Sequence, residues 1–157
     1  MLQFTKSTEY GLIGLVHLAD RRGEVVSVRE IAGTYKISRR HLGESLKALC
    51  RAGLLKSQRG VHGGYRLALE PEQVALSTIV AALEGEPALT SCETDHAESA
   101  GCHVEPHCPI RSPIQRIRQG LWRQMEQTSL RALIDEPLAL PGAPSPIEHL
   151  NLFPRGN

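Results

Sequence analysis

The sequence predicts a mainly helical fold with a small β-hairpin wing, a winged helix-turn-helix followed by a long C-terminal helix. Two short segments with helical apolar spacing follow each other between residues 27 and 52, each preceded by a serine that can cap a helix. Two short strand-like segments then flank a glycine-rich turn. Residues 112–133 return to a helical pattern. With 157 residues, the chain has room for one domain with appendages.

The first expected helix covers roughly residues 7–20. Thr5 or Ser7 can cap its start, and the run from Arg21 to Gly23 ends it. Ser27 and Glu30 form a capping-box pattern that opens a short helix through Ile31 and Ala32. Residues 33–37 then connect to a second cap at Ser38. Two helices this close together predict a helix-turn-helix.

The second helix of this pair is expected over residues 39–52, with two distinct faces. Its buried face has helical spacing and consists of Leu42, Leu46, Leu49 and Cys50. Its outward face consists of Arg39, Arg40, Gly43, Glu44, Lys47 and Arg51. The outward face is therefore the one available to a ligand.

A β-hairpin is expected after Gly53, with strands over residues 54–57 and 65–68. The connecting residues 58–64 are basic and rich in glycine, which is typical of a wing. No helix follows Gly63 and Gly64, so a nucleotide-binding loop is not indicated. Ser77 is expected to cap a further short helix that stops at Gly85.

The C-terminal half divides into three parts. Residues 86–109 lack any period and contain three cysteines, and residues 86–111 are taken as a cysteine-bearing loop. Ser112 and Pro113 open a long helix to about Leu133, within a segment taken as 112–135. An amphipathic helix at the end of a small domain usually packs against a twin or against its own domain. Residues 136–157, with five prolines, are expected to be an irregular tail, and residues 1–85 to form the winged helix.

Charge is segregated along the chain, although the net charge is only +1. Residues 36–66 carry eight basic residues and one acidic residue, a local net charge of +7, whereas acidic residues gather around the cysteines. A basic face of this kind favours duplex DNA over a membrane surface as the partner. The start of the chain resembles no secretory signal and no segment is apolar enough to span a membrane, so a cytoplasmic protein is expected.

The expected DNA contacts lie in two places. Arginine in a recognition helix can pair with guanine in the major groove, and arginine on a thin wing can enter the minor groove. The major-groove set is Arg39, Arg40, Glu44 and Lys47, and Arg59 is the wing reader. Ser38, at the start of the recognition helix, and Gly63, Gly64 and Tyr65, in the wing, complete the predicted contacts.

Cys92, Cys102 and Cys108 lie within seventeen residues, on a segment that contains glycine and proline. Three thiolates on an irregular segment can converge on one centre and suit an iron-sulfur cluster, either [2Fe-2S] or [4Fe-4S]. Zinc is an alternative, because His103 and His107 stand beside two of the cysteines. A metal-free thiol switch, or no role for these cysteines, stays open. Cys50 is expected in the core.

The chain resembles the iron-sulfur winged-helix regulators of the IscR and NsrR type over about residues 2–135. The resemblance rests on the opening LQFTKSTEYGL, the RG-x-x-GGY wing motif, and the three-cysteine segment followed by a long helix ending in TSLRAL. It implies a homodimer crossed through the C-terminal helix, a palindromic double-stranded DNA operator, and one cluster per protomer. An enzyme is not expected, since no nucleophile stands in a recognisable motif with a histidine and an acid.

The resemblance also concerns the fourth ligand of the cluster. Some members use a histidine three residues after the last cysteine, where this chain has Arg111. Members that sense nitric oxide use a carboxylate on the first helix, donated across the dimer, and Glu9 stands at the matching place. Glu9 is therefore the first choice, followed by His103 and His107. The implied signal is nitric oxide, redox state or iron-sulfur supply.

Overall fold

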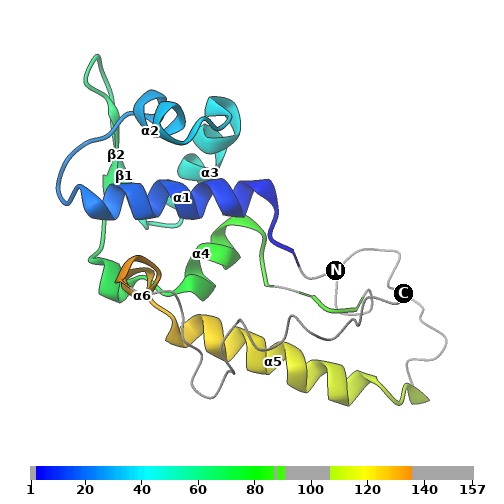
Figure 1. Ribbon diagram of the computed structural model, residues 1–157. Coiled ribbons are helices and arrows are strands. Elements are labelled where there is room, and N and C mark those ends of the chain that lie inside the picture. The colour runs from blue at the N-terminus through cyan, green and yellow to red at the C-terminus, as the bar shows by residue number, and fades with distance from the viewer. Residues whose placement is uncertain (1–2, 87, 91–106, 136–157) are drawn as a thin grey trace, which may run out of the picture.

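The predicted mainly helical architecture with one two-stranded hairpin is confirmed by a computed structural model, which describes residues 3–86, 88–90 and 107–135 (Figure 1). Cys92, Cys102, His103 and the tail therefore lie outside the described residues. The elements are α1 (Lys6–Asp20), α2 (Val28–Tyr35), α3 (Arg39–Arg51), β1 (Leu55–Gln58), β2 (Gly64–Leu67), the 3-10 turn η1 (Pro71–Gln73), α4 (Leu76–Leu83), α5 (Arg111–Gln127) and α6 (Leu130–Asp135).

The first three helices each begin after a hydroxyl side chain. The Oγ atoms of Thr5, Ser27 and Ser38 accept hydrogen bonds from the backbone N–H three residues further on. These bonds satisfy groups that a helix leaves without partners at its start. The reciprocal capping box predicted at Ser27 is wrong, because the Glu30 carboxylate pairs with Arg21 instead.

The prediction that the first helix of the helix-turn-helix ends near Ala32 is also wrong, since α2 continues through Gly33 to Tyr35. Glycine within a helix costs about 1 kcal/mol relative to alanine. A tertiary contact favours the longer helix, because the Tyr35 ring meets His17 of α1 edge-on at 5.5 Å between ring centroids. Lys36 then ends the helix in the left-handed conformation, with φ +54°.

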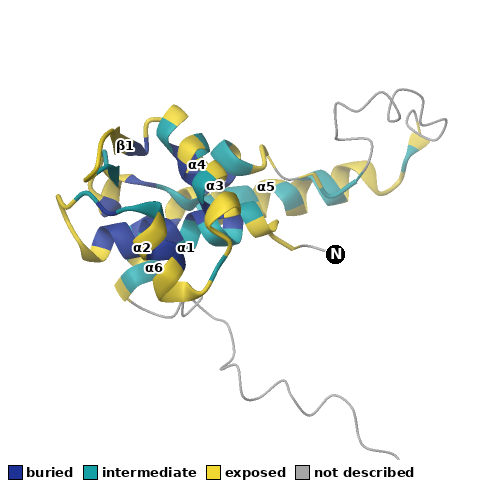
Figure 2. Cartoon of the chain, turned by 90° about the horizontal axis from the view of Figure 1, so that it is seen from above, coloured by how far each residue is buried: buried dark blue, intermediate teal, exposed yellow. Residues whose placement is uncertain are grey.

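The core lies where α1 and α3 cross, and α4, the hairpin and α6 close around it (Figure 2). The predicted inward residues of α3, Leu42, Leu46 and Leu49, are fully buried. Other buried members come from every part of the domain: Leu15, Leu18, Val26, Ile31, Leu54, Leu55, Val74, Ile79 and Leu130. This shared core fixes the position of α3 relative to the hairpin.

The hairpin pairs Leu55 with Leu67 and Gln58 with Gly64 in antiparallel register. It is joined to the chain before α2, because Val26 and Tyr65 exchange two backbone hydrogen bonds of 2.9 Å. The helix-turn-helix and the wing are therefore linked through backbone as well as through the core.

Two predicted caps are wrong. Ser77 does not cap α4, which begins at Leu76, and Ser77 lies buried within its first turn. Ser112 does not cap α5, which begins at Arg111 after Ile110. In neither case does the residue before the helix use a side-chain hydrogen bond.

The prediction of one helix from Ser112 to about Leu133 is wrong as well. α5 ends at Gln127, and the chain extends through Thr128 and Ser129 before α6 begins. The extended residues pair with the segment before α4: Leu76 N–H donates to the Thr128 carbonyl at 2.8 Å, and Leu130 N–H to the Val74 carbonyl at 2.7 Å. This pairing places Leu130 in the core.

α5 packs against α4 and otherwise projects from the helical body (Figures 1 and 2). It contains no buried residue in the single chain. Among the described helices, none is both long and apolar enough to cross a membrane.

Candidate nucleic-acid interface and sensor segment

The outward face of α3 is a basic stripe. Arg40, Glu44, Lys47 and Arg51 are exposed and follow one another at intervals of four, three and four residues. This spacing keeps them on one side of the helix. Arg39 is exposed at the first helical position, and the Ser38 Oγ accepts a 3.4 Å hydrogen bond from the His41 N–H.

Glu44 is the acidic member of this stripe. Its carboxylate accepts a 3.0 Å hydrogen bond from the Lys47 ammonium. This bond and the positive charges of Lys47, Arg40 and Arg51 lower the pKa of Glu44. Glu44 is therefore ionised at neutral pH and neutralises part of the stripe.

The wing holds Arg59 at its turn, exposed beside Gly60, which has φ +109°. Gly63 and Gly64, at the other side of the turn, must be glycines because other backbone atoms approach them closely. A Cβ on Gly63 would lie 2.7 Å from the Gln58 carbonyl oxygen, and a Cβ on Gly64 only 2.3 Å from the Val26 carbonyl oxygen. Neither neighbour can move away easily, because both are backbone atoms.

Tyr65 lies half-buried between the hairpin and α3. Burial raises the pKa of its phenol, so the hydroxyl keeps its proton at neutral pH. Cys50, expected in the core, packs against the core but stays half-buried as a free thiol. It is therefore accessible on the same side of α3 as the wing.

Of the candidate metal ligands, the structure describes Glu9, His107 and Cys108. Cys108 is a free, half-buried thiol just before α5, and His107 is exposed beside it. The Glu9 side chain is 35% exposed on the first turn of α1 and pairs with Lys6 at 2.5 Å. Within the described ranges, no three His, Cys, Asp or Glu side chains converge into a metal site.

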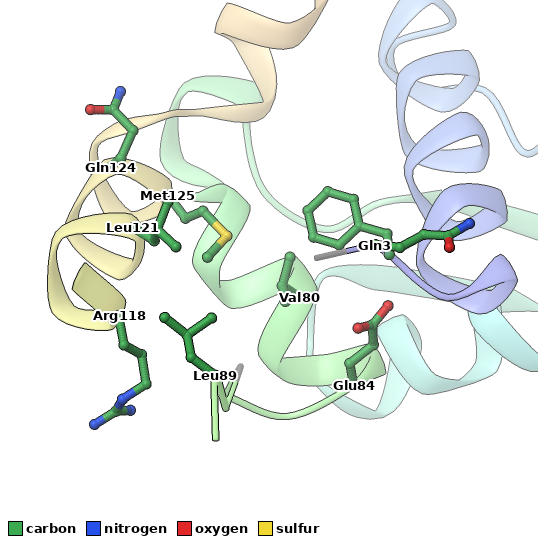
Figure 3. A pocket seen from close by; sticks show the side chains of 9 residues that line it. Gln3, Val80, Glu84, Leu89, Arg118, Leu121, Gln124 and Met125 are labelled. Atoms are coloured by element: carbon green, nitrogen blue, oxygen red, sulfur yellow. The ribbon is translucent and has the colours of Figure 1, made fainter. Parts of the chain in front are cut away.

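A largely apolar pocket of about 340 Å³ separates α5 from the start of the chain (Figure 3). Val80 of α4 and Leu121 and Met125 of α5 line it, together with Phe4 and Leu89. Glu84 holds the N-terminal segment here, since its carboxylate accepts hydrogen bonds of 2.7 and 2.8 Å from the backbone and hydroxyl of Thr5. Sequence reasoning missed this pocket because its walls come from distant segments.

The comparison with protein families identifies the class of this domain. Residues 4–136 match the model of the Rrf2 family, described as iron-dependent transcriptional regulators. The chain belongs to the Rrf2 family. It is therefore a DNA-binding transcriptional regulator and not an enzyme. The resemblance to winged-helix regulators inferred from the wing motif is confirmed.

Solved structures show the same Rrf2 fold. CymR, the global cysteine regulator of Bacillus subtilis, is 30% identical over 85% of this chain and 97% of its own, with a TM-score of 0.66. A transcriptional regulator from Listeria innocua is 29% identical, covers 96% and 95%, and has a TM-score of 0.71. IscR of T. potens is 25% identical, covers 85% and 86%, and has a TM-score of 0.64.

The close approach at Gly64 leads to a prediction for this Rrf2 wing. Gly64→Ala is expected to separate Val26 from Tyr65 and to lower the free energy of unfolding by about 1–3 kcal/mol, the usual effect of overpacking. Urea unfolding measures this effect. Gly33→Ala is the control, because nothing lies within 4 Å of that helical position and alanine favours the helix. Equal stability of the two variants would contradict the role assigned to Gly64.

Proposed function

We propose that this Rrf2 regulator senses nitric oxide, redox state or iron-sulfur supply through an iron-sulfur cluster bound by Cys92, Cys102 and Cys108. The observation that carries the proposal is the three-cysteine segment in a chain whose family is described as iron-dependent. Thiolates are the usual ligands of such clusters. Cys108, as a free and half-buried thiol, fits this donor set. The cluster would supply an iron-sulfur centre that reacts with oxidants or with nitric oxide.

The absorption spectrum of anaerobically purified protein tests the proposal, together with analysis for iron, sulfide and zinc. A visible iron-sulfur band with matching iron and sulfide supports it. Zinc without iron would support zinc binding by the cysteines and histidines of the same segment. A metal-free protein would favour a thiol sensor, the alternative suggested by similarity to the cysteine regulator CymR. Either of the last two results overturns the cluster proposal.

For DNA, we propose that α3 enters the major groove with Arg39, Arg40, Glu44 and Lys47 and that Arg59 reaches the minor groove. The support is geometric: α3 turns a basic stripe outward while its apolar face is fixed in the core, and the wing stands beside it. Ser38 begins the recognition helix. Gly64 and Tyr65 hold the wing in place against Val26, and Gly63 packs closely against the backbone of Gln58 and Gly60 within the turn.

We further propose that α5 pairs with α5 of a second copy, giving a dimer that reads a palindromic operator. Ile110, Ile117 and Leu121 of this region are 56%, 54% and 40% exposed, and Leu121 also lines the apolar pocket at Phe4. Clustered exposed apolar residues of this kind usually mark an interface.

Ile117→Glu is expected to convert the dimer to a monomer, because an ionised carboxylate cannot be buried there without a partner. Sedimentation velocity measures the mass. Gln119→Glu adds the same charge at an exposed position of the same helix, and this control should stay dimeric. An Ile117→Glu variant that still sediments as a dimer would place the interface elsewhere.

Glu9 is the proposed fourth ligand, donated by the partner subunit. Glu9→Ala is expected to keep a cluster, because a carboxylate is a hard, weak ligand beside three thiolates. The absorption spectrum of that cluster should be altered, and cluster-dependent DNA binding should be lost. The lost ion pair with Lys6 is exposed and contributes little to stability. Asp20→Ala, at the other end of α1, is the control. If His107→Ala changes the spectrum and Glu9→Ala does not, His107 replaces Glu9 in this scheme.

A further inference from the structure

A second hollow, of about 370 Å³, lies between the recognition helix and the wing. Lys47, Cys50 and Arg51 of α3 form one wall, and Ser57 of β1 and Tyr65 of β2 form the other. Arg51, Ser57 and Cys50 were not among the DNA contacts predicted from the sequence. Of these three residues, only Arg51 could have been found from the sequence, because it continues the helical spacing of Arg40, Glu44 and Lys47.

The lining combines two cations with two hydroxyl groups. Arg51 forms no ion pair within the described part of the chain, and Lys47 shares its charge with Glu44 alone. A guanidinium can bind a phosphate through two parallel N–H donors, and an ammonium binds it as a point charge. The Tyr65 phenol, whose pKa burial raises, remains available as an O–H donor.

The backbone of α3 does not favour an anion here. The hollow lies at the C-terminal end of the helix, where the helix dipole is negative. The side chains of Lys47 and Arg51 must therefore supply the attraction. An anion site built this way is sensitive to loss of a single side chain.

The position of the hollow favours one source of phosphate. It continues the outward stripe of α3 and ends at the strands that carry the wing, so DNA lying along both elements passes over it. We propose that this hollow binds one phosphate of the DNA backbone, with Arg51 and Lys47 as the cationic ligands and Ser57 and Tyr65 as hydroxyl donors. The proposal rests on DNA binding by the family and is independent of the cluster.

Cys50 gives the proposal a chemical consequence. Its thiol lies in the same hollow, so bound DNA should shield it from reagents. The half-buried position leaves part of the thiol exposed to reagents in the free protein, and a reagent-sized adduct would occupy the space of the phosphate.

The first experiment compares Arg51→Gln with wild type for binding to operator and to random-sequence duplex over a range of salt concentrations. Loss of one phosphate contact should reduce the slope of log K against log salt by about 0.9 and weaken binding about fivefold near 0.15 M salt, equally on both DNAs. Arg22→Gln is the matched control, because Arg22 is an exposed arginine paired with Glu70 and Glu72 outside the hollow. An unchanged slope in Arg51→Gln, or an equal change in both variants, overturns the proposal.

The second experiment follows alkylation of Cys50 by iodoacetamide in the full chain, read by mass spectrometry of the peptide that contains it. Random-sequence duplex should slow alkylation in wild type and protect less in Arg51→Gln. Inorganic phosphate is tested against chloride at equal ionic strength to separate the two sources of phosphate. Two results would overturn the proposal that the hollow binds a DNA backbone phosphate. One is protection of Cys50 by inorganic phosphate equal to its protection by DNA, and the other is no protection by DNA. Random-sequence DNA keeps both readouts interpretable even in protein that proves to contain no cluster.

Discussion

Cys108→Ala is expected to abolish stable cluster binding while the protein stays folded. The chain has four cysteines, and the fourth, Cys50, packs against the core beside the wing, so no spare thiolate replaces the lost ligand. Cys108 precedes α5, a helix without buried residues in the single chain, so its truncation removes little core packing. Iron and sulfide content and the visible spectrum measure the loss.

Two controls make this result specific. Cys50→Ser should retain the cluster, since Cys50 is assigned to the DNA side of the domain. Urea unfolding of apo-protein should give nearly equal stability for wild type and Cys108→Ala. Normal iron and sulfide content in Cys108→Ala would remove Cys108 from the ligand set, and the same experiment applies to Cys92 and Cys102.

Leu130→Ala is expected to lower the free energy of unfolding by about 2–5 kcal/mol, the usual effect of truncating a buried leucine. Leu130 is completely buried, and its N–H donates to the Val74 carbonyl. The site therefore has little room to collapse after truncation. Urea or thermal unfolding of the full chain measures the change.

Leu69→Ala provides the matched control, because Leu69 is 42% exposed and the same truncation leaves no cavity there. Its effect should be well below that of Leu130→Ala. Equal effects would show that α6 does not belong to the core of the winged helix. The larger loss of stability expected for Leu130→Ala would instead show that the DNA-binding unit extends beyond residue 85 and includes α6.

The parts of the fold that depend on local interactions were predictable from the sequence. Thr5, Ser27 and Ser38 cap helices because their hydroxyls reach backbone groups three residues away, which a sequence pattern reveals. The outward stripe of α3 follows from the period of an α-helix. The motif containing Gly63 and Gly64 was recognised, but its reason, contact with backbone at Val26 and Gln58, required the structure.

The end of α5 was not predictable in this way. No glycine or proline marks Thr128 and Ser129, and the apolar spacing continues to Leu133. The helix ends because these residues pair with Val74–Leu76, more than fifty positions earlier in the chain. The pocket at Phe4 was missed for a similar reason, since its walls come from segments that are far apart in sequence. The walls of the hollow beside the wing all lie within residues 47–65, but they meet only when the hairpin packs against α3. Of the proposed cluster ligands, only Glu9, His107 and Cys108 lie in the part of the chain that the structure describes.

The two hydrogen bonds that join Thr128 and Leu130 to the start of α4 make α5 a lever arm. Its C-terminal end is held to the domain that carries α3, so a tilt of α5 relative to that domain would strain these hydrogen bonds and the packing of α5 on α4. A helix of 17 residues is about 25 Å long, and a tilt of roughly 10° moves its far end by about 4 Å. Half-sites on DNA are separated by about 34 Å, one helical turn. In the dimer that we propose, a small rotation of α5 near Cys108 would therefore alter the separation of the two recognition helices and with it their fit to the operator.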